Sequence, residues 1–94
     1  MAFALVRLIV QDQAKWKTVF AEAQELRKKY GSKGVRAFAK TDNPNEIVIL
    51  GEYESLDQAR QLFQSQEFRD ATQRAGTVGA PDVTFLEKIT ELPA

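Results

Sequence analysis

Hydrophobic and polar positions alternate along the first ten residues of the chain. In residues 3–10 one face carries only apolar side chains, and the other face carries a single charged residue, Arg7, among apolar ones. A period of two residues is typical of a β-strand. Because both faces of this strand are mostly apolar, we expect both to be covered. The all-apolar face consists of Ala4, Val6, Leu8 and Val10.

The spacing becomes helical after this strand. Apolar residues recur every three or four positions from Trp16 to Tyr30, which predicts one amphipathic helix of about four turns. Asp12 precedes this segment and is a residue type that caps helix N-termini, and Gly31 follows it as a helix stop.

Two strands follow. Residues 33–40 alternate between apolar and polar positions, and residues 46–53 are again rich in β-forming residues. Between them, residues 41–45 place Pro44 among Asn and Asp side chains, which predicts a type I turn. We therefore expect a hairpin.

The second half of the chain repeats the helix and strand pattern. Ser55 and Gln58 match a capping box, in which each side chain bonds a free backbone N–H at a helix start. Ser65 caps a second helical segment, which Gly76 ends. Residues 82–90 predict the last strand.

A stretch rich in glycine and alanine, residues 73–81, precedes this last strand. A phosphate-binding loop runs from a strand to a helix N-terminus, whereas this stretch runs from a helix to a strand. We therefore expect it to turn the chain, and a ligand contact at a pocket mouth is the alternative.

The element order is β-α-β-β-α-β, which is the ferredoxin-like arrangement: an α+β fold with a four-stranded antiparallel sheet and the helices on one face. Its other face would expose Phe3, Leu5, Ile9 and Phe38. So large an apolar patch is unusual on a monomer. We expect a second copy to cover it, sheet against sheet, and residues 1–94 to form a single domain.

Composition narrows the function. Lys plus Arg and Asp plus Glu both number 13, and this neutral balance argues against nucleic-acid binding. The chain has no Cys and no His, which removes thiolate chemistry, the commonest general base and the commonest metal ligands. No segment has the roughly 20 apolar residues that span a membrane. We expect a cytoplasmic protein without a bound metal or cofactor.

Four segments together resemble the antibiotic biosynthesis monooxygenase-like group of the dimeric α+β barrel superfamily. They are residues 16–20 (WKTVF), 42–48 (DNPNEIV), 53–60 (YESLDQAR) and 75–81 (AGTVGAP). The resemblance covers nearly the whole chain and implies a homodimer of ferredoxin-like subunits.

The resemblance also implies oxygenase chemistry without cofactors. Such relatives place an Asn on the first strand, and residues 3–10 contain none. Where many relatives have Trp-Glu-Ser after the third strand, this chain has Tyr53, Glu54 and Ser55. The haem-degrading and cyclising relatives rely on His, which this chain lacks.

Several residues are candidates for a site that binds an aromatic or quinone-like molecule. Arg7 and Arg36 are catalytic candidates as anion stabilisers, and Tyr53 as a hydrogen-bond donor. The ligand-binding candidates are Trp16, Phe38, Glu52 and Tyr53. Each has a structural alternative: Trp16 as a core residue, and Arg7 with Glu52 as an ion pair near the dimer-side face.

Two functions follow from these candidates. In the first, the protein acts on an electron-rich phenol or quinol, whose anion reacts directly with oxygen in a dry aromatic pocket. In the second, the protein is a non-catalytic ligand-binding or structural homodimer. Binding of another protein through the helices is a third alternative.

Overall fold

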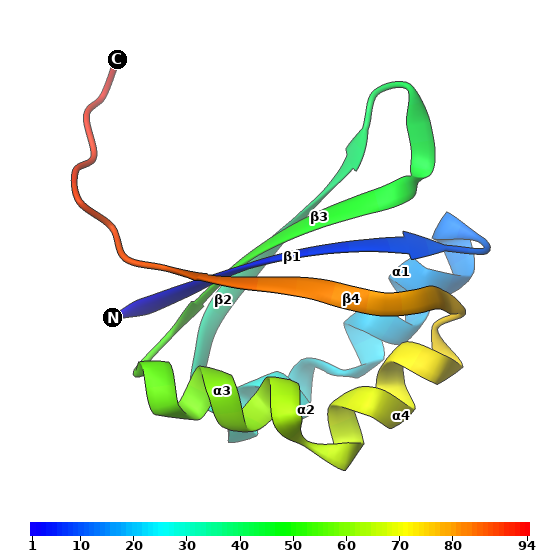
Figure 1. Ribbon diagram of the computed structural model, residues 1–94, viewed down its shortest axis with the longest axis horizontal. Helices are drawn as coiled ribbons and strands as arrows, with labels where there is room; N and C mark the ends of the chain where they lie inside the picture. The colour runs from blue at the N-terminus through cyan, green and yellow to red at the C-terminus, as the bar shows by residue number, and fades with distance from the viewer.

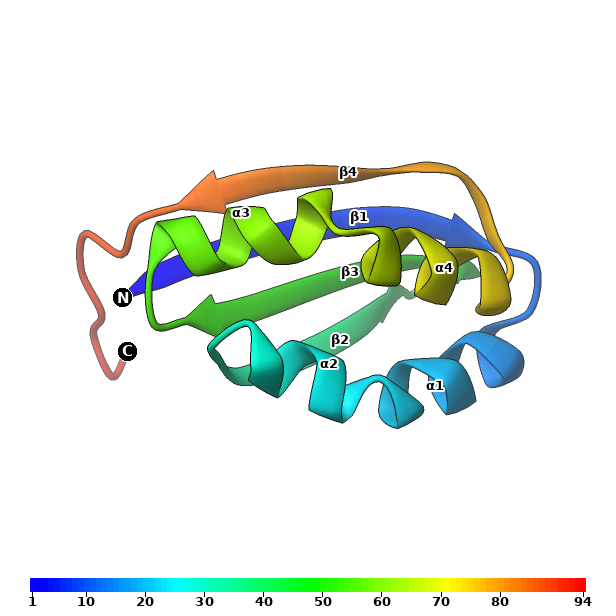
Figure 2. The ribbon, with the colours of Figure 1, turned by 90° about the horizontal axis from the view of Figure 1, so that it is seen from below.

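The computed structural model describes all 94 residues, Met1–Ala94. A four-stranded antiparallel sheet carries all of its helices on one face, in two rows (Figures 1 and 2). The strand order is β2-β3-β1-β4. This is the expected ferredoxin-like arrangement, with the second helical region in two segments as predicted and the first, predicted as one helix, also split in two. The elements are β1 (Ala2–Val10), α1 (Gln13–Glu22), α2 (Gln24–Lys29), β2 (Ser32–Lys40), β3 (Asn43–Tyr53), α3 (Leu56–Gln64), α4 (Gln66–Arg74) and β4 (Thr77–Leu86).

The core lies between the sheet and the helices. Val6 pairs with Ile49 and Leu8 with Ile47 across β1 and β3, and all four side chains are buried against the helices. Since side chains alternate along a strand, the residues between them point to the opposite face. We call this the outer face. The strand alternation of residues 3–10 predicted both sets.

Three side chains cap the helices as the sequence predicts. Asp12 accepts a hydrogen bond from the Ala14 N–H at 3.0 Å, Ser55 from the Gln58 N–H at 3.2 Å, and Ser65 from the Phe68 N–H at 3.1 Å. The second half of the predicted capping box is wrong, because the Gln58 side chain accepts a bond from the Ser55 hydroxyl at 3.1 Å instead of capping its backbone.

The first helical region is broken at Ala23 and not continuous. The Ala23 N–H bonds to the carbonyls of both Val19 and Phe20, which is the mark of a tightened last turn. α2 then begins without a side-chain cap. None of the helices is both long and apolar enough to cross a membrane.

The β2–β3 hairpin turns earlier than the sequence predicts. Lys40 pairs with Asn43, so the turn consists of Thr41 and Asp42, and Pro44 lies at the start of β3. A proline is tolerated there because the first residues of a strand can do without one ladder N–H.

The last strand is displaced from its predicted position, residues 82–90. It begins at Thr77 and ends at Leu86. Gly76 stops α4 with a φ of 76°, and Gly79, with a φ of 72°, lies where the β1–β4 register shifts. The glycine-rich stretch is therefore a helix stop and a bulged strand more than a loop. Residues 87–94 form no helix or strand and extend beyond the sheet (Figure 1).

Candidate functional site

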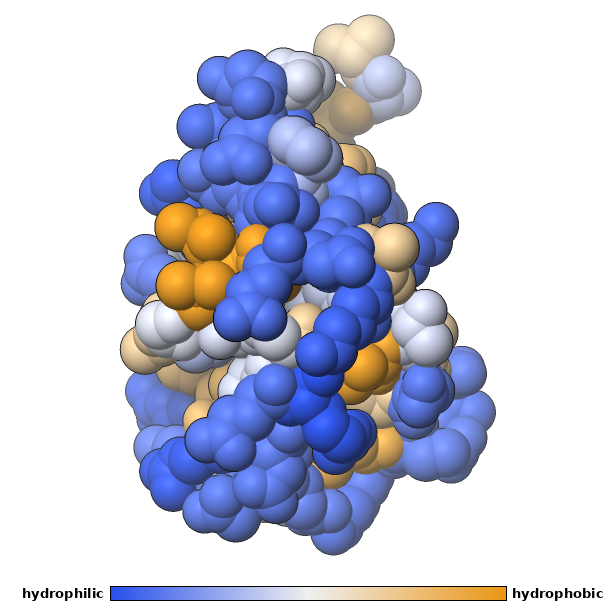
Figure 3. All heavy atoms as spheres, turned by 90° about the vertical axis from the view of Figure 1, so that its right-hand side faces the viewer, coloured by the Kyte–Doolittle hydropathy of each residue, from blue (hydrophilic) through white to orange (hydrophobic).

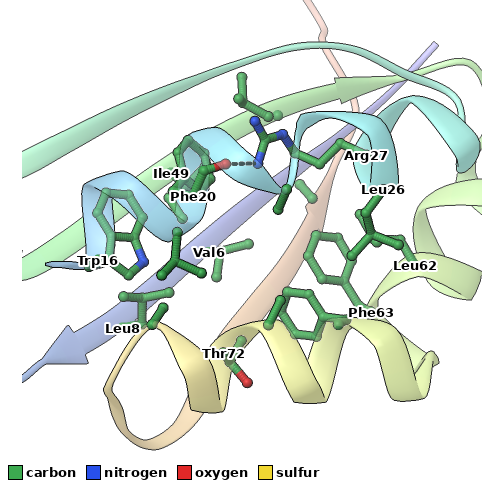
Figure 4. A pocket seen from close by; sticks show the side chains of 18 of the residues that line it. Val6, Leu8, Trp16, Phe20, Leu26, Arg27, Ile49, Leu62, Phe63 and Thr72 are labelled. Carbon is green, nitrogen blue, oxygen red and sulfur yellow. Dashed lines mark hydrogen bonds between the residues drawn. The ribbon is translucent and has the colours of Figure 1, made fainter.

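A cavity of about 80 Å³ lies inside the molecule, between the sheet and the helices. Its lining is almost entirely aliphatic and aromatic (Figure 4). The cavity lies between two groups of buried residues, one containing Trp16, Val6 and Leu8, and the other containing Tyr53 and Leu62. An apolar cavity with few polar groups is the usual form of a small-molecule site.

Tyr53, at the end of β3, supplies the most distinctive polar group of the cavity. The residue is 2% exposed, and none of the side-chain hydrogen bonds within the protein involves its hydroxyl. Burial raises the pKa of Tyr53 to about 12, and the charge of Arg27 opposes this rise. At neutral pH the side chain is therefore a neutral phenol whose O–H is free to bind a ligand.

Arg27, on α2, is the only charged residue in the cavity lining. Its Nη1 donates to the Phe20 carbonyl at 2.7 Å, and its guanidinium lies 4.2 Å from the centre of the Phe20 ring (Figure 4). Burial lowers the pKa of Arg27, and the interaction with Tyr53 opposes this. An arginine nevertheless stays charged in proteins. The site therefore combines one fixed cation with the neutral, unbonded hydroxyl of Tyr53.

Arg27 is not among the site residues that the sequence predicts. The available signal was its spacing, because Arg27 follows Phe20 by seven positions and Ala23 by four, which places it on the apolar face of the helical segment. A charged residue on such a face is uncommon unless it is paired.

Trp16 forms the other end of the lining. It is 6% exposed and its ring stacks on Phe20, with 4.7 Å between centroids. Trp16 is therefore both a core residue and part of the cavity wall. These are the two positions that the sequence allowed for it.

The other candidates do not join this site. Arg7, Arg36, Phe38 and Glu52 all lie on the outer face of the sheet. Phe38 is 56% exposed, and Arg36 and Glu52 line a separate hollow of about 260 Å³ on that face. Sequence alternation alone could not tell which face would hold a cavity.

The expected ion pair between Arg7 and Glu52 is wrong. In the antiparallel register Arg7 lies opposite Val48, and its guanidinium contacts Glu46 at 3.6 Å. Glu52 lies opposite Phe3, two pairs further along the same face.

The cavity offers no conventional general base. No Asp, Glu or Lys lines it. The structure also gathers no group of three or more carboxylates that could hold a metal ion. Any proton removed from a ligand must therefore pass to water or to a group outside the lining.

Comparisons with known proteins agree with this fold. The sequence model described as antibiotic biosynthesis monooxygenase matches residues 4–74. A search of curated proteins gives no match. A similar solved structure is a protein of Bordetella bronchiseptica that is provisionally named as an antibiotic biosynthesis monooxygenase, with a TM-score of 0.81 at 19% identity over 95% of this chain and 97% of that one. SnoaB, a cofactor-independent oxygenase of Streptomyces nogalater, has a TM-score of 0.80 at 16% identity over 99% of this chain and 97% of its own.

Proposed function

Because the chain belongs to the antibiotic biosynthesis monooxygenase family, we propose that it binds a small phenol or quinol in the inner cavity and promotes its reaction with oxygen without a metal or organic cofactor. One observation carries this proposal. Among the few polar groups of a mostly apolar lining, the guanidinium of Arg27 is the only cation and the hydroxyl of Tyr53 is a free hydrogen-bond donor, so both can bind an oxygen anion.

The reaction class follows from these partners. An electron-rich phenol loses its proton, and the negative charge of the anion spreads to a ring carbon. That carbon forms a bond with O₂ and donates the electron pair, which gives a hydroperoxide after protonation. Breaking the O–O bond, with loss of the C–H proton from the same carbon, then yields a carbonyl and water. The substrate supplies all the electrons, so no further reductant is consumed.

The protein's part is electrostatic. Arg27 attracts the phenolate and the neutral Tyr53 donates a hydrogen bond to it, and both lower the pKa of the bound phenol. A cavity that excludes water strengthens both effects. Because no carboxylate or His lines the site, the proton must pass to water outside the cavity or to a group beyond its lining.

Non-catalytic ligand binding is the second candidate, and the missing general base favours it. Under this alternative the protein holds the same phenol and gives no product. The two candidates agree on the binding site and differ only in turnover.

We also propose that the protein is a homodimer whose outer sheet faces pack together. Ile9 is 50% exposed, Phe38 56% and Val78 51% on that face. Viewed from the end of the molecule where β1 finishes, hydrophobic side chains form patches in a mostly hydrophilic surface (Figure 3). A second copy packed on the outer face would bury Ile9, Phe38 and Val78. It would leave the inner cavity, on the other side of the sheet, unobstructed.

Oxygen uptake with electron-rich phenols tests the proposal. We expect Arg27→Met to reduce turnover about tenfold or more, because a charged hydrogen-bonding group near the developing anion is lost. Arg27→Lys keeps the charge and should recover part of the rate. Arg7→Met is the matched control, since it removes an arginine from the outer face only. Equal losses of turnover for Arg27→Met and Arg7→Met would contradict the inner site. If phenol binds but is not turned over, only the non-catalytic binding function remains.

A further inference from the structure

The volume of the inner cavity limits the size of its ligand. The cavity measures about 80 Å³, whereas an apolar protein cavity of about 150 Å³ holds one benzene molecule. One ring can therefore enter if a single side chain moves aside. Two or three fused rings would need several side chains to move at once, which a close-packed core resists.

Phe63, on α3, is the side chain best placed to move. Among the partly buried hydrophobic residues, it is the only one that packs against both groups of buried residues on either side of the cavity. Its ring makes edge contacts with Tyr53 and Phe68, at centroid distances of 6.0 and 5.0 Å. Figure 4 shows Phe63 among the lining side chains, on the side of α3 and α4. The residue is only partly buried, so turning its ring toward the surface disrupts less packing than moving a fully buried side chain would.

The polar groups of the cavity fix the position of one oxygen atom. Arg27 and Tyr53 both line the cavity, so we place the phenol oxygen on their side of it. The Tyr53 ring also contacts Phe63. A ring attached to an oxygen that Tyr53 binds would therefore lie close to Phe63.

We infer that the substrate is a single-ring phenol or quinol and that Phe63 sets this limit. The inference rests on the proposed function of the cavity and adds the size class of its ligand. Phe63 is then a specificity-determining residue, because its ring, once moved aside for the first ring, still bounds the space where a second fused ring would lie.

A series of phenols that differ only in ring number tests the inference. Phenol, 2-naphthol and 2-hydroxyanthracene are titrated into the wild-type protein without oxygen, and calorimetry gives each Kd. The indole N–H signal of Trp16, the single tryptophan, reports whether the cavity is the site. In an unrestricted apolar site each added ring would tighten binding, because more apolar surface is buried. We expect the reverse, with 2-naphthol at least tenfold weaker than phenol.

Phe63→Leu should remove the limit. We expect this variant to bind 2-naphthol at least tenfold more tightly than the wild type and phenol with a smaller gain, because the ring that both ligands must displace is gone. Phe85→Leu is the matched control, because Phe85 lies 6.1 Å from Phe63, centroid to centroid, but does not line the cavity. A wild type that prefers 2-naphthol, or two variants that behave alike, would overturn the inference. If Phe63→Leu does not fold, the wild-type ring series alone decides.

The failure of the proposed function gives a different result. In that case no phenol releases heat or shifts the Trp16 signal. Binding of all three phenols with rising affinity would instead keep the proposed site and refute the size limit.

Discussion

The ring of Tyr53 lies against the Cα of Gly51, two residues earlier on the same face of β3. A Cβ at position 51 would be 2.9 Å from Tyr53 Cε2 and 3.1 Å from its hydroxyl oxygen. Gly51 does not have a positive φ, so the glycine provides space and not backbone freedom. It thereby positions the free hydroxyl of the cavity.

Gly51→Ala should displace this ring. We expect the free energy of unfolding to fall by about 1–3 kcal/mol, because overpacking a core costs this much. Urea unfolding measures the change. In a Tyr53→Leu background the same substitution should cost clearly less, since the clashing ring is gone. An equal cost in both backgrounds would show that Gly51 does not act through Tyr53.

Tyr53 should make the protein sensitive to alkaline pH. Burial raises its pKa from 10.0 to about 12, so the folded state favours the neutral phenol. This contribution to stability is complete below about pH 10 and is lost as the pH rises toward 12. Between about pH 9 and 11.5 we expect the free energy of unfolding to fall by about 2 kcal/mol more in the wild type than in Tyr53→Phe. Urea unfolding at both pH values measures this, and equal losses would contradict the pKa assignment.

Glu67 should hold the two rows of helices together. Lys29 donates to its carboxylate at 3.1 and 3.2 Å, and the Tyr30 hydroxyl donates at 3.1 Å. No other side-chain hydrogen bond links the α1–α2 row to the α3–α4 row. We expect the backbone amide hydrogens of α2 to exchange with solvent about two- to fivefold faster in Glu67→Gln. The effect is modest because an exposed ion pair adds little to the stability of the contact between the two rows.

The control for Glu67 is Glu25→Gln. This variant removes an ion pair with Lys28, at 3.6 Å, that lies within α2 alone. Bonds from Lys29 and Tyr30 hold the pKa of Glu67 below 4.5, so its contribution is present above that pH and is lost as the pH falls further. If amide exchange of α2 is accelerated equally in both variants, Glu67 does not link the two rows of helices. Unchanged protection of the α2 amides in acid would also contradict that role.

The outer sheet face should mediate dimer formation. Native mass spectrometry of the wild type is expected to give twice the chain mass of 10.6 kDa. Phe38→Lys should weaken the dimer at least tenfold, because it places an unpaired charge in an apolar interface. Leu56→Lys changes an exposed residue on α3 and should leave the dimer intact. A monomeric wild type, or a dimer lost only with Leu56→Lys, would refute this interface.

The sequence predicted those features that neighbouring residues determine. Asp12, Ser55 and Ser65 cap helices because a short polar side chain reaches an N–H two or three residues ahead. The strand faces follow from a fixed period of two. Strand ends, in contrast, depend on pairing with another strand, so β4 starts at Thr77 although its composition suggested a loop.

The candidate site was only half predictable, for the same reason. Tyr53 and Trp16 stood out as aromatic residues and do line the cavity. Arg27 did not stand out, because its role depends on lining the same cavity as Tyr53. Tyr53 lies 26 positions further along the chain. The partner of Arg7 depends on strand register, which one sequence does not specify.

The location of a bound phenol tests the central claim most directly. Ile49 points into the inner cavity, whereas its neighbours Val48 and Leu50 point to the outer face. With phenol bound, we expect nuclear Overhauser effects from its ring protons to the methyl groups of Val6 and Ile49, and none to those of Val48 and Leu50. Effects at Val48 and Leu50 alone would place the ligand on the outer face and contradict the proposed site.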